Sequence, residues 1–227
     1  MIRVVMLGAG DFAVPLWRAL EEAEGVEVVA TVVQPDRPAG RGGKKELRAC
    51  ALKRAAEAAG VKPEAAGDVN AKEFLDKLRG WKPDVTVVAD FGQKLEEEQL
   101  LAVAPAVNVH PSLLPKYRGA SPIQWTLANG DEETGVCVLC VTDRMDAGDV
   151  LEEAREAVRP EDDAETLEAR LAEIGGALLV KAVRAVAAGT AKGRVQDDAA
   201  ATRARKLKKE DGLQNLMRGK SFGLMTS

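Results

Sequence analysis

The sequence predicts an α/β protein built on a doubly wound, mostly parallel, Rossmann-like β-sheet. Two patterns indicate this fold class. Short runs of mainly apolar residues, at 2–7, 26–33 and 84–89, are typical of strands buried on both faces of a parallel sheet. Segments with apolar residues at helical spacing separate these runs, and such alternation favours parallel strands joined by crossover helices.

The elements of the first half follow in order from local patterns. Residues 2–7 predict the first strand, and apolar residues at helical spacing after the turn GAGD predict a helix to about Ala23. Residues 26–33 predict a second strand. The segment 35–45 contains two prolines, three glycines and four basic residues, which predicts a flexible surface loop. Helices are then expected at 46–59 and 71–78, and strands at 84–89 and 106–110.

The second half predicts a strand pair and a long helix. Strands at 135–142 and 150–158 flank the turn DAGD at 146–149, after a short helix at 123–128. The alanine- and leucine-rich segment 165–188 predicts a long helix, and the chain after it is polar and weakly patterned. We therefore expect one domain at 1–190, with a polar tail or linker remnant at 191–227.

Net charge, apolar run lengths and cysteine content argue against several classes of protein. A net charge of −4 argues against a surface that binds polyanions broadly, although local basic patches are compatible with it. No apolar run reaches the roughly 18 residues of a membrane-spanning helix, and the apolar start is too short for a signal peptide. Three cysteines without an export signal favour reduced thiols and a cytoplasmic location.

The single histidine, His110, marks the most informative segment, which reads VNVHPSLLPKYRG at 107–119. In a strand, Asn108 and His110 point to the same face, and Pro111 then prevents helical continuation. An Asn amide can donate a hydrogen bond to a developing oxyanion, and a His can move protons near neutral pH. The pair therefore suits acyl chemistry, and its structural alternative is a His–Asn pair that caps the strand end.

The first turn resembles a dinucleotide-binding fingerprint. GAGDFA at 8–13 matches the G-x-G-x-x-A pattern after a first strand. Asp11 lies where a pyrophosphate would approach, and the second strand ends in Gln34-Pro35-Asp36 without an acid at its tip. These features favour a tight strand–helix turn over nicotinamide dinucleotide binding.

Two other motifs have both a chemical and a structural interpretation. Cys137-x-x-Cys140 suggests a redox or zinc site, but strand residues three apart face opposite sides and no second pair completes four ligands. Buried structural cysteines are therefore favoured. Asp143, Asp146 and Asp149 are typical of a solvated hairpin, although one of them can approach His110 and favour its charged form.

Two basic segments are candidates for contact with an anionic substrate. The glycine-rich segment 37–48 is either a solvated flap or a lid that orders on such a substrate. The segment 203–209 is more typical of a solvated charge run.

The chain resembles the folate-dependent formyltransferases. The resemblance starts from NVHPSLLPKYRG and from DAGD, in which Asp146 follows His110 by 36 residues. QPDRPAGRG at 34–42, ASPIQ at 120–124 and NGDEETGV at 129–136 are similar to the methionyl-tRNA-specific branch, as are DFA at 11–13 and KLKKEDG at 206–212. It covers residues 2–212 and implies a formyltransferase-type fold.

The resemblance implies transfer of a formyl group from 10-formyltetrahydrofolate to a primary amine, without a metal. It assigns the formyl oxygen to Asn108, stabilisation of the intermediate and proton transfer to His110, and orientation of His110 to Asp146. It implies initiator methionyl-tRNA as the partner, with no membrane involved. It also assigns folate contacts to Phe91, Gly92, Ser112, Leu113, Leu114 and Pro115, and acceptor contacts to Arg41 and Gly42.

Three departures from the family pattern bear on the substrates. tRNA-specific members continue into a second, barrel-like domain, whereas only 15 residues follow Gly212 here. The first turn reads GAG where a Gly-Thr-Pro type turn is usual, and Asp90 replaces a small apolar residue before Phe91. The missing domain concerns the binding of tRNA, and the changes in sequence concern the detailed contacts with the folate.

The sequence is compatible with three alternative functions. A nucleotide-linked amino sugar is the alternative acceptor, since enzymes for such sugars share the KYRG motif. A folate-binding or tRNA-binding module without catalysis is a different class, and the joint presence of Asn108, His110 and Asp146 argues against it. A nicotinamide oxidoreductase is the remaining alternative.

Overall fold

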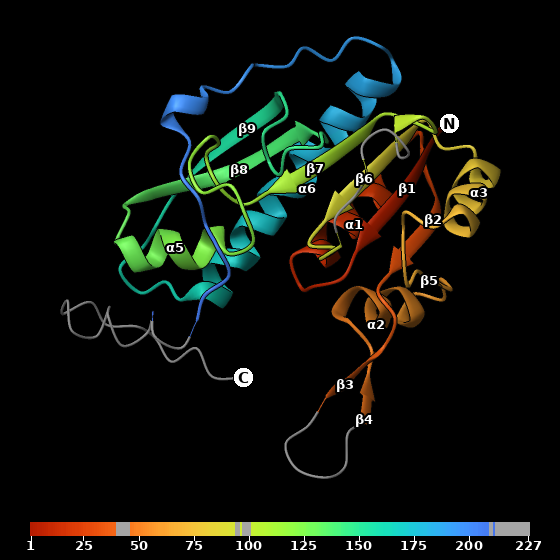
Figure 1. Cartoon of the computed structure of the whole chain (residues 1–227), viewed down its shortest axis with the longest axis horizontal. Coiled ribbons are helices and arrows are strands. Elements are labelled where there is room, and N and C mark those ends of the chain that lie inside the picture. The colour runs from red at the N-terminus through yellow and green to blue at the C-terminus, as the bar shows by residue number, and fades with distance from the viewer. Residues whose placement is uncertain (40–45, 94–95, 97–100, 209–210, 212–227) are drawn as a thin grey trace.

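A seven-stranded sheet forms the centre of the computed structural model, which describes residues 1–39, 46–93, 96, 101–208 and 211 (Figure 1). The strand order is β5-β2-β1-β6-β7-β8-β9. The first five of these strands run parallel, and β8 and β9 are added antiparallel at one edge. The predicted doubly wound, mostly parallel sheet is therefore confirmed. The strands are β1 (Ile2–Gly8), β2 (Val26–Val33), β5 (Glu64–Ala65), β6 (Val85–Ala89), β7 (Ala106–His110), β8 (Glu133–Cys140) and β9 (Val150–Ala157).

Helices cover both faces of the sheet because successive residues of the central strands point to opposite sides. On one face, Val4 and Met6 of β1 pack in a core cluster with residues of α1 (Ala13–Glu22) and α6 (Ala164–Ala187). On the other face, Val5 and Leu7 pack with Phe74 and Leu78 of α3 (Lys72–Trp81). Both faces of β1 are thus buried, which explains its continuous apolar sequence.

Two glycines let α6 lie close to α1 and the sheet. A Cβ added to Gly176 would lie 2.9 Å from the Cβ of Ala19 in α1, and one added to Gly175 would lie 3.0 Å from Leu16. Helix α6 begins with a capping box in which Asp163 and Thr166 exchange hydrogen bonds. The predicted long helix is confirmed within one residue at each end.

The segment after β2 differs from the prediction. Arg37–Ala39 (β3) and Glu46–Arg48 (β4) pair antiparallel as a two-stranded hairpin that projects from the domain beyond α2 (Figure 1). The expected helix at 46–59 begins only at Ala51, as α2 (Ala51–Ala58). Pairing across the hairpin gives Glu46–Arg48 backbone partners outside a helix, which a local pattern does not reveal. Residues 40–45, with Arg41 and Gly42, lie outside the described residues.

Residues 190–208 lie against the domain, although the sequence predicts a polar tail. Figure 1 shows this blue segment passing over β9 and descending to α5 (Pro122–Asn129). Arg194 pairs with Val150 and Arg203 with Arg118 through isolated β-bridges. Ala204 is fully buried, and a short 3-10 helix forms at Asp198–Ala200. Backbone pairing thus docks a segment that has little apolar periodicity. Among the described residues, no helix is long and apolar enough to cross a membrane.

Candidate functional site

Strand β7 presents Asn108 and His110 from the middle of the sheet. Its neighbours are β6 and β8, so the strand end is enclosed on both sides. Val107 and Val109 point into the core beneath α1 and α6, which leaves Asn108 and His110 on the opposite side of the strand. His110 is only 4% exposed, so its ring is held by the protein.

Asp146 joins Asn108 and His110 at this strand end. The Asn108 Nδ2 amide donates to Asp146 Oδ1 at 3.1 Å, and the backbone N–H of Gly119 donates to Oδ2 at 2.8 Å. His110 Nδ1 lies 3.7 Å from Asp146 Oδ2. Of the three aspartates in this turn, Asp146 is therefore the one that meets both strand residues. Its backbone has φ +53°, a left-handed conformation that directs the side chain to this position.

The neighbours of His110 determine which of its two ring nitrogens carries a proton. Nε2 lies 2.9 Å from the carbonyl oxygen of Tyr117, which can only accept a hydrogen bond. Nε2 therefore carries a proton, and Nδ1 faces the carboxylate of Asp146. A proton gained at Nδ1 gives an imidazolium whose charge lies beside that carboxylate. The arrangement is suited to proton exchange at Nδ1.

The loop at 112–115 is fixed by its own contacts. Ser112 Oγ donates to the carbonyl of Lys116 at 2.7 Å, so this buried hydroxyl serves the loop. Leu114 packs in a core cluster with Cys137 and Leu139. Leu113 and Pro115 are half-buried. Their side chains, and not those of Ser112 and Leu114, are the ones within reach of a ligand.

Hydrogen bonds of two glutamine side chains connect the segment after β6 to neighbouring loops. Gln34 donates from Nε2 to the carbonyl of Phe91, whose side chain is buried. Gly92 has φ +72°, and an added Cβ would lie 2.7 Å from Gln34 Nε2, so this position requires glycine. Gln93 donates to Ala66 O at 2.9 Å and accepts from Val69 N at 3.2 Å. The segment thus joins the loops that follow β2 and β5.

Three carboxylates gather at the first turn, between β1 and α1. Asp90 lies against the turn, since a Cβ on Gly10 would be 1.8 Å from its Oδ2. Burial raises the pKa of Glu168 to about 7, and the charges of Asp90 and Asp11 add to the rise. Burial also raises the pKa of Asp90, with the charge of Asp11 as the second cause. A pyrophosphate would meet negative charge here, which disfavours dinucleotide binding at this turn.

Cys137 has the features of a buried structural thiol. Burial raises its pKa to about 12, although its sulfur accepts a hydrogen bond from the backbone N–H of Leu114 at 3.4 Å. A thiol of this kind is a poor nucleophile and a poor metal ligand at neutral pH. Among the residues that the structure describes, no group of three or more His, Cys, Asp or Glu is arranged to hold a metal ion.

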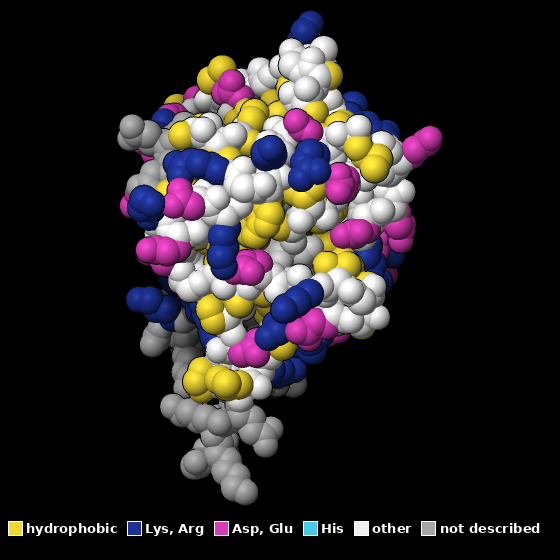
Figure 2. Space-filling view, turned by 90° about the vertical axis from the view of Figure 1, so that its right-hand side faces the viewer, with side chains coloured by type: hydrophobic (Ala, Val, Ile, Leu, Met, Phe, Trp, Pro, Cys, Tyr) yellow, Lys and Arg dark blue, Asp and Glu magenta, His cyan; other side chains and the backbone are white. Residues whose placement is uncertain are grey.

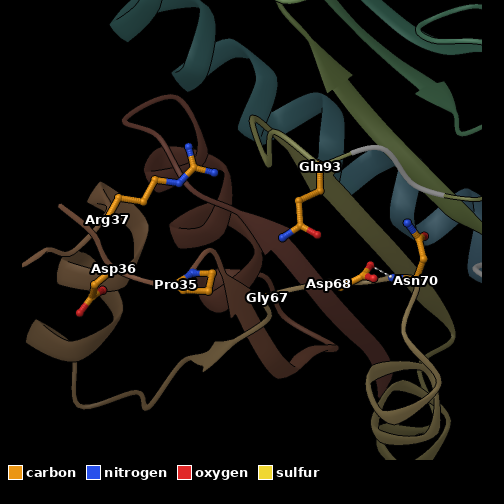
Figure 3. Close-up of a pocket in the computed structure, with 7 residues that line it drawn as sticks. All are labelled: Pro35, Asp36, Arg37, Gly67, Asp68, Asn70 and Gln93. Carbon is orange, nitrogen blue, oxygen red and sulfur yellow. Dashed lines mark hydrogen bonds between the residues drawn. The ribbon is translucent and has the colours of Figure 1, made fainter. Parts of the chain in front are cut away.

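A shallow cavity of about 610 Å³ lies at the carboxyl end of the sheet, at the base of the hairpin. Figure 3 shows Gln93 pointing into the space between Pro35 on one side and Asp68 and Asn70 on the other. Arg37, the first residue of β3, reaches over this space. The lining is mostly polar, and it joins the hairpin to the strand end that carries Phe91 and Gly92.

Several residues around the site have roles that could not be predicted from the sequence. Tyr117 contributes a backbone carbonyl and Gly119 a backbone N–H, and neither role depends on a side chain. Gln196 donates from Nε2 to the carbonyls of Asp146 and Gly148 at 2.9 and 2.7 Å. It lies in a segment without periodicity, so no local pattern indicates it.

A family model described as formyl transferase matches residues 2–183 of this chain. The methionyl-tRNA formyltransferase of Anaeromyxobacter sp. (strain K) is 46% identical over 213 residues, which are 93% of this chain and 67% of that protein. The chain thus spans about two thirds of the length of this relative.

Solved structures share the fold. Phosphoribosylglycinamide formyltransferase from Anaplasma phagocytophilum aligns with a TM-score of 0.69 at 21% identity, over 91% of this chain and 99% of that one. An N-formyltransferase from Helicobacter canadensis, in complex with folinic acid and dTDP-3-aminofucose, aligns with a TM-score of 0.66 at 18% identity. That alignment covers 93% of this chain and 72% of the other.

Proposed function

Because the chain belongs to the formyl transferase family, we propose that it transfers the formyl group of 10-formyltetrahydrofolate to the amine of methionyl-tRNA. The observation that carries this proposal is the convergence of Asn108, His110 and Asp146 at the end of β7. A relative named for this activity is 46% identical over most of the chain, which supports the same acceptor. Both substrates are cytoplasmic molecules, so the proposal places the protein in the cytoplasm.

The proposed reaction is direct attack of the neutral methionyl amine on the formyl carbon. A C–N bond forms to the amine, and the carbonyl electron pair moves to the formyl oxygen. The tetrahedral intermediate then collapses, the bond to folate N10 breaks, and N10 receives a proton while the amine loses one. The products are formylmethionyl-tRNA and tetrahydrofolate.

Asn108 is proposed to stabilise the oxyanion. Its Nδ2 carries two hydrogens, and Asp146 Oδ1 accepts one of them at 3.1 Å. The second hydrogen is available for the formyl oxygen, and the bond to Asp146 fixes the direction of the amide.

His110 is proposed to move the proton between the two amines. Nε2 is bound to the carbonyl of Tyr117, so Nδ1 is the ring atom that exchanges protons. The adjacent Asp146 stabilises the imidazolium formed in this exchange and keeps the ring in orientation. A buried ring with one fixed nitrogen needs little reorganisation during the reaction.

For the folate, we propose a site between the β6 end and the loop after β7. Gly92 supplies backbone without a Cβ, and the half-buried Leu113 and Pro115 supply apolar contact. Phe91, Ser112 and Leu114 are buried and shape this site from beneath.

For the acceptor, we propose the polar cavity beneath the hairpin. Its lining includes Arg37 and Asn70, which suit phosphate and ribose groups at an RNA end. The hairpin leads into 40–45, so Arg41 and Gly42 are proposed to contact the acceptor there. On the face that carries α3 and β2, basic and acidic side chains are interspersed (Figure 2), so that face offers no broad basic surface for tRNA.

A formyl-transfer assay with two acceptors tests the proposal. The purified chain and 10-formyltetrahydrofolate are incubated with charged initiator tRNA in one reaction and with a nucleotide-linked amino sugar in the other. We expect formylation of the tRNA at least tenfold faster, with uncharged tRNA as the control. Faster formylation of the amino sugar would replace the acceptor. Folate binding without transfer to either acceptor would favour a binding module.

A further inference from the structure

Two backbone segments enclose His110, and both adopt conformations that are rare outside glycine. Tyr117, whose carbonyl meets His110 Nε2, has φ +63°, and Asp146 has φ +53°. Left-handed conformations of non-glycine residues cost free energy and persist only where surrounding contacts hold them. The residues that hold these two segments therefore set the geometry around the imidazole.

The docked segment 194–204 supplies such contacts to both. Thr202 Oγ1 accepts from the backbone N–H of Tyr117 at 2.8 Å, and Thr202 O accepts from Arg118 N at 2.9 Å. Arg118 O accepts from Ala204 N at 2.8 Å. On the other side, Arg194 exchanges backbone hydrogen bonds with Val150, close to the turn that carries Asp146.

Gln196 is a buried side chain that connects the two segments, which exposed Asp198 also bridges through Arg118 Nη1 at 2.8 Å and Arg144 Nη2 at 2.7 Å. Its Nε2 donates to Asp146 O at 2.9 Å and to Gly148 O at 2.7 Å. Its Oε1 accepts from Arg118 Nε at 3.0 Å and from Nη2 at 2.8 Å. The residue is 7% exposed, so water does not readily replace these partners.

The chemistry of this position requires a carboxamide. Two donors face two carbonyls, and one oxygen accepts two guanidinium hydrogens, so the full capacity of the amide is used. Glutamate at this position would turn a negative oxygen toward two carbonyl oxygens. Alanine would leave two buried carbonyls and the Arg118 guanidinium without these bonds, which costs more than the loss of contact area.

We propose that Gln196 is a positioning residue, which holds the Asp146 turn and the Arg118 loop in register around His110. This inference rests on the proposed function, because it concerns the geometry of the same three side chains. Gln196 acts through Asp146 and Tyr117 and touches no reacting atom.

Substitution of Gln196 combined with two independent readouts tests the inference. Gln196→Ala removes all four bonds, and Gln196→Glu keeps the size and the acceptor while it removes both donors. Val195→Ala is the matched control, because the adjacent Val195 side chain is 76% exposed and has no hydrogen-bonding group. Thermal unfolding identifies variants that fail to fold.

The first readout is the imidazole NMR signal, which is unambiguous because His110 is the single histidine. We expect both Gln196 variants to shift this signal, while Val195→Ala leaves it unchanged. The second readout is kinetic. We expect kcat to fall about 10- to 100-fold, as for a small misplacement of a reacting group, with KM for the formyl folate within about twofold.

The two readouts separate this inference from the proposed function. Shifted His110 signals in a chain without formyl transfer would support the positioning role and contradict the proposed function. Wild-type His110 signals and wild-type kcat in folded Gln196→Glu would overturn the positioning role. If Gln196→Ala does not fold, the near-isosteric Gln196→Glu carries the test.

Discussion

At the residue scale, one carboxylate organises the candidate site. Asp146 accepts from the side chain of Asn108 and from the backbone of Gly119, and it lies beside Nδ1 of His110. Its two oxygens therefore fix the proposed oxyanion donor, Asn108, and lie beside the proposed proton carrier, His110. The spacing of the three acids alone leaves open which of them approaches His110, and the structure places Asp146 there.

Asp146→Asn separates the two roles of this side chain. The amide keeps the shape and one acceptor oxygen but removes the negative charge beside His110. We expect kcat to fall at least tenfold, because the charged ring loses its partner, while KM for the formyl folate stays within about twofold. Steady-state kinetics with charged tRNA measure both values. Wild-type turnover would return Asp146 to a structural turn residue.

The raised pKa of Glu168, at the first turn, predicts that its ionisation destabilises the fold, whereas the ionisation of most acids in proteins stabilises it. The folded pKa of Glu168, about 7, lies above its ordinary value of 4.5. Its contribution to stability is therefore present below about pH 4.5 and is lost as pH rises through 7. We expect Glu168→Gln to raise Tm at pH 8 by about 2–4 °C, which corresponds to roughly 1 kcal/mol in a domain of this size after solvent screening.

Calorimetry at pH 5 and pH 8 checks this expectation. The difference in Tm between wild type and Glu168→Gln should be larger at pH 8 than at pH 5. An equal difference at both values would show that the carboxylate charge does not act at this turn.

At the element scale, the hairpin and the docked segment differ most from what the sequence predicts. Strands β3 and β4 have three residues each, and Leu47 within them is exposed, so neither alternation nor burial marks them. The segment 190–208 is held by backbone and side-chain hydrogen bonds to residues far away in the sequence. Local patterns predict elements that bury a face and do not predict elements held by long-range backbone pairing.

Arg41→Ala tests the proposed acceptor role of the hairpin loop. We expect it to raise KM for charged tRNA at least fivefold, with KM for the formyl folate nearly unchanged, because it removes the proposed phosphate contact. Lys181→Ala removes the same charge from α6, where Lys181 pairs with Glu152, and serves as the control. Steady-state kinetics across a salt series provide the measurement. Equal salt dependence of tRNA kinetics in wild type and Arg41→Ala would contradict the assignment of this loop.

At the scale of the whole molecule, the sheet brings distant residues to one edge. Strands β1, β6 and β7 are parallel neighbours, so the first turn, the Phe91–Gly92 segment and His110 all lie at their carboxyl ends. Ligands of doubly wound sheets bind at this edge. The described residues proposed for folate, acceptor and catalysis thus lie along one edge of the sheet, although Arg37 and Asp146 are more than 100 residues apart in the chain.

The buried strands and α6 are predictable from sequence because each has a long apolar pattern with a clear end. Asn108 and His110 are predictable as a pair because strand alternation alone places them on one face. The meeting of Asp146 with both depends on the antiparallel addition of β8 and on a left-handed turn, neither of which a local pattern fixes. Gln196 and the carbonyl of Tyr117 are found only once the chain is folded.

The proposed roles of Asn108 and His110 are tested by a comparison of wild type with Asn108→Ala and His110→Ala in formyl transfer to charged tRNA. Turnover and folate binding are measured on the same preparations, the latter by isothermal titration. We expect kcat to fall roughly 10²- to 10⁴-fold in each variant, with the dissociation constant for reduced folate within about threefold of wild type. Normal turnover in either variant, or folate binding lost in parallel with turnover, would contradict the proposed roles of these two side chains.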